Sequence, residues 1–174
     1  MSEQPGRYQR SAAGMIGAML ILLAVVVGFV LFRDAIREDP QSPVKTVDYH
    51  RTLGFAREQA TFDVLAPERL PDGWRATSVE FIPEPFRWHL GVLTDGGEYV
   101  GLEQAHGSER SMVSTYVDRE AAAGADVVID GRHWSSWSDQ GGDRALVRAN
   151  AGVVTLVVGS VPQDVLVDYV ESLR

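Results

Sequence analysis

The 174-residue sequence contains no cysteine. A disulfide scaffold, a zinc site with cysteine ligands and an iron–sulfur cluster are therefore excluded, because each of them requires thiols. Basic residues are outnumbered as well, with 16 Lys and Arg against 24 Asp and Glu and a net charge of −8. An ordinary nucleic-acid binder is not expected, because its affinity depends on basic side chains that meet phosphates.

The sequence motifs of common catalytic and cofactor sites are also missing. There is no Gly-x-Ser-x-Gly nucleophile turn, no Gly-x-x-x-x-Gly-Lys phosphate loop and no Gly-x-Gly-x-x-Gly dinucleotide motif. No two histidines have the spacing that would place both on one helix face as metal ligands. The histidines are His50, His89, His106 and His133. We therefore expect no enzyme, no cofactor and no bound metal.

A long uncharged run near the N-terminus is the most distinctive feature that is present. Residues 12–32 comprise 18 apolar residues and three glycines, with no charge and no proline. A helix needs roughly 20 apolar residues, at about 1.5 Å each, to cross the hydrocarbon core of a membrane. The run is longer than the roughly 7–15 apolar residues of a cleaved signal peptide, and no small-x-small cleavage site follows it. We therefore predict a retained transmembrane helix over residues 12–32, embedded in the lipid bilayer.

The charge of the chain changes sign at the end of this run. Residues 1–32 carry a net charge of +1, and residues 33–174 carry one of −9. A short basic tail, residues 1–11, before a long uncharged run is typical of a signal-anchor. We predict a single-pass plasma-membrane protein with a cytoplasmic N-terminus and an extracytoplasmic C-terminal domain. A charged stalk with two prolines, residues 33–46, is expected to connect the helix to the domain.

Residues 47–174 have the patterning of a single α+β domain. Short alternating or apolar segments predict strands, and glycine-containing turns between them predict hairpins. The predicted strands span residues 62–65, 75–82, 86–93, 98–105, 126–130, 132–138, 144–150 and 152–159. Hairpin-linked strands with few helices imply a mainly antiparallel sheet flanked by helices.

Three helices are predicted in this domain. The first lies within residues 47–60. The second spans residues 108–123, with Ser108 as its N-cap and a glycine after its end. The third closes the chain, where Ser160 and Gln163 match a capping box and the apolar positions that follow form one stripe.

Tryptophan and histidine side chains supply the candidate surface for a partner or ligand. Tryptophan is enriched at binding interfaces, because it offers a large apolar area with one hydrogen-bond donor. Trp134 and Trp137 have opposite strand parity, so one can face outward while the other packs inward. Burial of the tryptophans in the core is the alternative interpretation. The candidate surface residues are Trp88, His89, His133, Trp134 and Trp137.

Several segments of the sequence resemble one family. They are Thr46-Val-Asp-Tyr49, Val64-Leu-Ala-Pro-Glu-Arg-Leu-Pro-Asp-Gly-Trp-Arg-Ala-Thr77, Trp88-His-Leu-Gly91 and Gly97-Glu-Tyr-Val-Gly-Leu-Glu-Gln104. Together with the uncharged run and the final helix, they resemble an uncharacterised family of single-pass membrane proteins of high-GC Gram-positive bacteria, catalogued as a domain of unknown function. The resemblance implies a location in the cell envelope and no activity.

These observations favour a membrane-anchored, non-enzymatic envelope protein whose exported domain binds a protein partner or a small ligand. A scaffolding subunit of a membrane complex is an alternative, and it predicts an exposed apolar patch around Trp134 or Trp137. A membrane-tethered hydrolase is a further alternative, and it predicts a pocket in which two carboxyl groups face each other.

Overall fold

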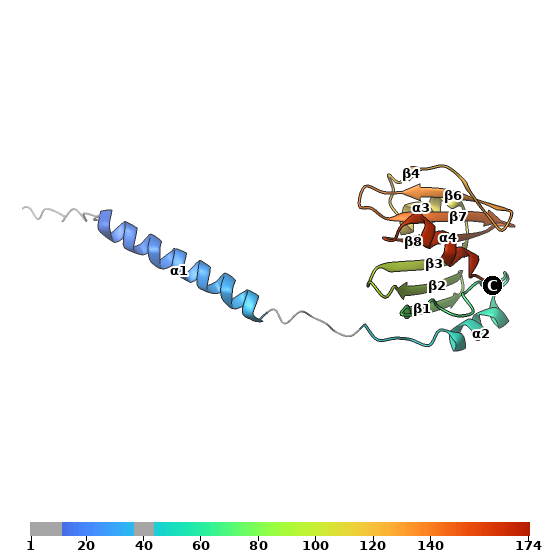
Figure 1. Cartoon of the computed structure of the whole chain (residues 1–174), viewed down its shortest axis with the longest axis horizontal. Coiled ribbons are helices and arrows are strands. Elements are labelled where there is room, and N and C mark those ends of the chain that lie inside the picture. The colour runs from blue at the N-terminus through green and yellow to red at the C-terminus, as the bar shows by residue number, and fades with distance from the viewer. Residues whose placement is uncertain (1–11, 37–43) are drawn as a thin grey trace, which may run out of the picture. The chain divides into compact units, whose positions relative to one another are not determined.

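The structure is a computed structural model that describes residues 12–36 and 44–174 (Figure 1). The chain divides into two compact units, Met1–Val44 and Lys45–Arg174. The predicted N-terminal tail, residues 1–11, and residues 37–43 of the predicted stalk lie outside the described residues.

The described part of the N-terminal unit contains one helix, α1 (Ala12–Ile36), of 25 residues. It includes the whole uncharged run and continues into the first residues of the predicted stalk. No proline interrupts its backbone hydrogen bonds. Large apolar side chains along α1 are exposed, for example Met19 at 74 % and Phe29 at 65 %. Among the described residues, no helix combines the length and the apolar character that crossing a membrane requires.

The C-terminal unit contains an eight-stranded antiparallel sheet with helices, which confirms the predicted α+β class. The strands are β1 (Arg75–Pro83), β2 (Phe86–Leu93), β3 (Tyr99–His106), β4 (Ala122–Ala123), β5 (Val127–Ile129), β6 (Arg132–Ser138), β7 (Arg144–Asn150) and β8 (Val153–Gly159). Their order in the sheet is β1-β2-β3-β8-β7-β6-β4, and β5 also pairs with β6.

Two three-stranded meanders make up most of this sheet (Figure 1). One consists of β1, β2 and β3, the other of β6, β7 and β8, and they meet where Val100 of β3 lies opposite Gly159 of β8. Short turns of the predicted kind close the hairpins. In the β5–β6 turn, Asp130 and Gly131 have φ values of 50° and 72°. A two-residue hairpin requires this conformation, and the Asp-Gly dipeptide favours it.

The larger core fills one face of the sheet, under α2 (His50–Gln59) and α4 (Gln163–Glu171). Every second residue of a strand points to this face. The strand residues buried there are Ala76, Trp88, Leu90, Val92, Val100, Leu102, Ile129, Trp134, Leu146 and Val157. The helices add Leu53 and Ala56 from α2, and Leu166, Tyr169 and Val170 from α4. We call this side of the sheet the α4 face.

A smaller core lies on the opposite side, which we call the α3 face, under α3 (Glu109–Tyr116). It consists mainly of Met112, Val113, Ala121, Ala145, Val147, Val154, Leu156 and Val158, and its strand residues belong to β7 and β8. Over β1, β2 and β3, the α3 face carries mostly polar residues and glycine instead. They include Ser78, Glu80, Arg87, His89, Gly91, Gly101 and Glu103.

The helix predicted over residues 108–123 is shorter in the structure, because α3 ends at Tyr116. The Asp118 side chain accepts a hydrogen bond at 2.7 Å from the backbone N–H two residues further on, which forms a turn. Ala122–Ala123 then pair with β6 as β4. An aspartate turn and strand pairing therefore outweigh the apolar periodicity of this segment.

One of the two predicted helix caps forms in the structure, and the other does not. Ser108 caps α3 as predicted, accepting a hydrogen bond from the N–H three residues on. The capping box predicted from Ser160 and Gln163 does not form, and the N-cap of α4 is Pro162. The Ser160 N–H donates to the Tyr99 carbonyl at 3.2 Å, so this residue extends the pairing of β8 with β3.

Candidate functional site

The segment that follows α2 is fixed to the α4 face by side chains rather than by strand pairing. The strand predicted over residues 62–65 does not form. In its place, the Gln104 amide accepts a hydrogen bond from the Leu65 N–H at 2.7 Å and donates one to the Asp63 carbonyl at 3.2 Å. The same amide nitrogen lies 3.1 Å from Thr155 Oγ1. Gln104 of β3 therefore satisfies backbone groups that a neighbouring strand would otherwise satisfy.

Further hydrogen bonds connect this segment to the core and to the C-terminal residues. The Trp88 indole N–H donates to the Leu65 carbonyl at 2.9 Å. Arg57 of α2 donates through Nε to the Val64 carbonyl at 3.1 Å, and through a terminal nitrogen to the Arg174 carbonyl at 2.6 Å. The segment thus has a fixed position beside α2 and the last residues of the chain.

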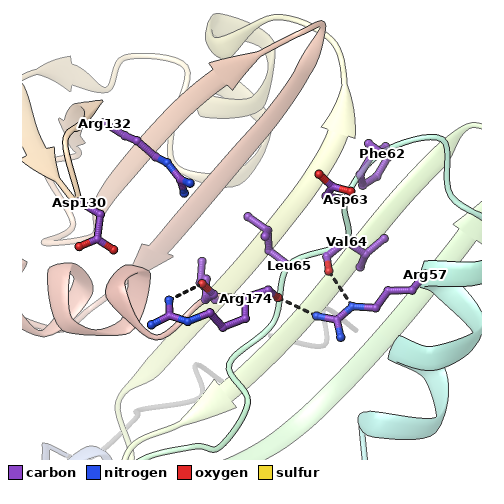
Figure 2. A pocket seen from close by; sticks show the side chains of 9 residues that line it. Arg57, Phe62, Asp63, Val64, Leu65, Asp130, Arg132 and Arg174 are labelled. Carbon is purple, nitrogen blue, oxygen red and sulfur yellow. Dashed lines mark hydrogen bonds between the residues drawn. The ribbon is translucent and has the colours of Figure 1, made fainter.

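An open groove of about 660 Å³ lies between this segment and the β5–β6 turn (Figure 2). It is lined by Arg57, Phe62, Asp63, Val64, Leu65, Asp130, Arg132, Leu173 and Arg174. The Arg132 side chain extends from β6 toward the centre of the groove, whereas Arg57 and Arg174 turn toward main-chain carbonyls (Figure 2).

A second hollow of about 370 Å³ adjoins this groove, because Asp63 and Arg132 line both. It adds the side chains of His106 and Arg148. We call the two together the arginine groove. Within the described part of the chain, neither Arg132 nor Arg148 has an ion-pair partner.

The sheet register explains how a charged side chain comes to lie beside the core. On the α4 face, Trp88 lies opposite Gln104, and Gln104 lies opposite Thr155. Arg148 of β7 continues this row opposite Thr155. This row of paired residues therefore begins at the buried ring of Trp88 and ends at the guanidinium of Arg148, which lines the groove.

The charges of the arginine groove suit an anion. A guanidinium binds carboxylate or phosphate groups through parallel N–H donors. Two acidic residues, Asp63 and Asp130, also line the groove, on opposite sides of it (Figure 2). The arginine groove therefore presents the guanidinium groups of Arg132 and Arg148 to an oxyanion.

The three candidate tryptophans lie on different faces of the sheet. Trp88 and Trp134 belong to the core of the α4 face, with exposures of 0 % and 4 %. Trp137 lies on the α3 face, where its indole N–H donates to Glu109 at 2.9 Å and the Arg110 guanidinium lies 5.7 Å from the ring centre. These rings therefore do not form the exposed apolar patch that the scaffolding hypothesis predicts.

The two candidate histidines have different surroundings. His133 is exposed on β6 and makes no side-chain hydrogen bond with the described residues. His89 lies on the α3 face, with Nε2 at 2.8 Å from Ser78 Oγ and Nδ1 at 2.5 Å from Glu103 Oε1. Although Trp88 and His89 are adjacent in sequence, they point to opposite faces, so the five candidate residues do not share one surface.

Two tyrosines lie near this histidine and carboxylate. Burial, and then the charge of Glu103, raises the pKa of Tyr99 to about 12. Burial, followed by the same charge, also raises the pKa of Tyr116 above its usual value. Both phenols therefore keep their protons at neutral pH and can donate hydrogen bonds.

Sequence reasoning missed the arginine groove, although strand parity held a signal for part of it. Arg132 is two residues before Trp134, and Arg148 is two residues after Leu146, so each shares a face with a buried residue. A charged residue on an apolar face is informative. The segment after α2 carried no such signal, because its position depends on the distant side chain of Gln104.

The fold and the groove define an α+β domain, built on an antiparallel sheet, with an open arginine-bearing groove on one face. The chain belongs to the family described as "Protein of unknown function (DUF4245)", whose model matches residues 7–173. No curated protein matches the chain. Family membership confirms the resemblance at the level of a domain of unknown function and assigns no activity.

Proposed function

We propose that this chain is a membrane-anchored envelope protein whose C-terminal domain binds a small oxyanion-bearing ligand in the arginine groove. One observation carries the binding function, namely the two guanidinium groups of Arg132 and Arg148. They line the groove without an ion-pair partner among the described residues. Binding in this groove requires no catalytic group.

The sequence supports the membrane anchor. Residues 12–32 form an uninterrupted uncharged run of 21 residues, and α1 is helical throughout it. The described large side chains of α1 are exposed, and a helix with apolar side chains all round needs an apolar environment. The basic tail before the run favours a cytoplasmic N-terminus and an extracytoplasmic domain at the plasma membrane.

The chemistry of the groove favours a carboxylate or phosphate group as the bound part of the ligand. Residues 33–174 carry a net charge of −9, so an anion approaching the domain elsewhere meets repulsion. Unpaired guanidinium groups supply the local attraction, and each fork fixes the orientation of a planar or tetrahedral oxyanion. The backbone-bound Arg57 and Arg174 contribute charge but have fewer free donors.

Titration calorimetry of the full chain in detergent tests the binding function, with inorganic phosphate and citrate as probes. We expect saturable binding of at least one probe, weakened about tenfold or more by Arg132→Gln or Arg148→Gln, because each loses a charge-assisted hydrogen bond. Arg119→Gln, at an exposed arginine outside the groove, is the matched control. Equal affinity in all four proteins contradicts the groove as the binding site.

Protease treatment of intact spheroplasts tests the anchor and its orientation separately. We expect the chain to stay with the membrane after alkaline carbonate washing, and the C-terminal domain to be digested by externally added protease. Release of the chain by carbonate contradicts the anchor. Complete protection of the domain contradicts the orientation alone and leaves the binding function intact.

A further inference from the structure

A second cluster of polar side chains lies on the α3 face of the first meander, which consists of β1, β2 and β3. Its chemistry differs from that of the arginine groove. Ser78, His89 and Glu103 come from three adjacent strands, β1, β2 and β3. His89 lies directly opposite Glu103 in the register. A register shift between Ala76 and Ser78 places Ser78 opposite Gly91, next to the histidine ring.

The distances in this cluster fit hydrogen bonds that run in one direction. Glu103 Oε1 lies 2.5 Å from His89 Nδ1, and a carboxylate there accepts the Nδ1 proton. His89 Nε2 then carries a lone pair, and it lies 2.8 Å from Ser78 Oγ. A serine hydroxyl, an imidazole and a buried carboxylate in this order form the arrangement that activates a serine nucleophile.

Ser78 and Glu103 differ in their exposure to solvent. Glu103 is only 3 % exposed, and its Oε2 atom has no hydrogen-bond partner among the described residues. The His89 side chain is 22 % exposed, and Ser78 is partly exposed. Gly91 leaves space beside Ser78 for its side chain, because a Cβ at this position would overlap Ser78 Oγ and touch the Tyr99 ring. A buried carboxylate with an unpartnered oxygen is costly to the fold, which favours a functional role for it.

We propose that Ser78, His89 and Glu103 form a nucleophilic site that hydrolyses a small carboxylic ester. Ser78 Oγ forms a bond to the acyl carbon while its proton moves to His89 Nε2, and the carbonyl electron pair moves onto oxygen. When that pair returns, the alcohol leaves with the proton from His89. Water then attacks the acyl–serine ester through the same histidine, which releases the carboxylic acid and restores Ser78. The Tyr99 hydroxyl, which lies beside Gly91 as Ser78 Oγ does, is the hydrogen-bond donor for the oxyanion.

This activity goes beyond the proposed binding function, because it uses a different face and different residues. The test is a serine-reactive fluorophosphonate probe and p-nitrophenyl acetate, applied to the folded full chain in detergent. We expect a covalent adduct on Ser78, located by mass spectrometry, and ester hydrolysis that Ser78→Ala abolishes. His89→Ala should slow labelling about 100-fold or more, since it removes the base. Glu103→Gln should slow it about tenfold or more, since it no longer holds the imidazole tautomer.

Matched controls separate this site from general reactivity. Ser135→Ala removes a serine on the same sheet face, and His133→Ala removes an exposed histidine, and neither should change labelling or hydrolysis. Circular dichroism of every variant establishes that it is folded. The absence of an adduct on Ser78 in the unaltered chain overturns the proposal. Hydrolysis that persists in Ser78→Ala, or that falls equally in Ser135→Ala, overturns it as well.

Discussion

The α3 face of the sheet differs between the two meanders, although one row of paired residues crosses both. In the first meander this row consists of Glu80, His89 and Glu103. At the β3–β8 boundary Glu103 lies opposite Leu156, and the row continues through Val147 of β7. Charged and titratable side chains thus change to aliphatic ones between two neighbouring strands.

The difference follows the position of α3. Over β7 and β8 the helix excludes water, so the side chains beneath it are aliphatic and buried. No helix of the smaller core covers β1 and β2, and there the strands carry polar groups instead. The aliphatic residues on this face of the second meander are explained by their contribution to stability. The partly exposed and hydrogen-bonded cluster of the first meander is better explained by a function. The following substitutions test this contrast.

Leu156→Ala should have the largest effect, because Leu156 is fully buried under α3. Truncating a buried leucine to alanine lowers the free energy of unfolding by about 2–5 kcal/mol. Urea unfolding of the full chain, followed by tryptophan fluorescence, measures the loss. Val128→Ala, at a residue that is 59 % exposed, is the control and should change stability by less than about 0.5 kcal/mol. A small loss for Leu156→Ala would show that α3 does not stabilise the second meander.

Gln104→Leu should have the next largest effect, and it tests the opposite, α4 face of the first meander. It leaves the Leu65 N–H and the Asp63 carbonyl without the amide that bonds them. Both hydrogen bonds are partly buried, and a hydrogen bond contributes about 0.5–1.5 kcal/mol net, so we expect a loss of about 1–3 kcal/mol from the two in the same unfolding measurement. Faster proteolysis of the segment after α2 should accompany it. An unchanged protein contradicts the anchoring role of Gln104.

Tyr99→Phe should have a smaller effect, visible only in alkali. The pKa of Tyr99 is about 12 in the folded chain, above the usual value of 10.0. The unfolded chain therefore loses this proton at a lower pH, and the free energy of unfolding falls as the pH rises from 10 to 12. Tyr99 as a residue is 39 % exposed, so solvent screening limits the change. Tyr99→Phe should make the decline shallower, which unfolding curves at several pH values measure. An identical slope contradicts the burial of this phenol beside Glu103.

Ser78→Ala should have the smallest effect on stability, within about 0.5 kcal/mol, because Ser78 is partly exposed and alanine adds no atoms. The same urea measurement determines it. A loss above about 2 kcal/mol would mean that the serine maintains the fold. The difference in stability loss between Ser78→Ala in the first meander and Leu156→Ala in the second would then disappear.

The sequence predicted regular elements well where local patterns determine them. Seven of the eight predicted strands correspond to strands of the structure, because alternating side chains and Asp-Gly or Gly-Gly turns act over a few residues. The exception, residues 62–65, has an apolar pattern but bonds to the Gln104 side chain. The early end of α3 similarly depends on Asp118 and on pairing with β6.

The candidate sites were less predictable, because they combine residues that are distant in sequence. Arg57 and Arg132 meet in one groove only after the sheet has formed. Ser78 reaches His89 because of a register shift in β1, and no short motif signals such an irregularity. Composition and motifs could therefore predict the α+β fold class, but not which charged side chains meet.

The pairing of β3 with β8 has a consequence for how the protein is made. Leu102 pairs with Val157, across more than 50 residues of chain, whereas each meander is closed by local hairpins. During synthesis β3 leaves the ribosome long before its partner, and an unpaired strand edge invites association with other chains. Non-local strand pairing is also slow to form. Chains that stall before residue 153 should therefore aggregate or be degraded, although they already contain a complete first meander.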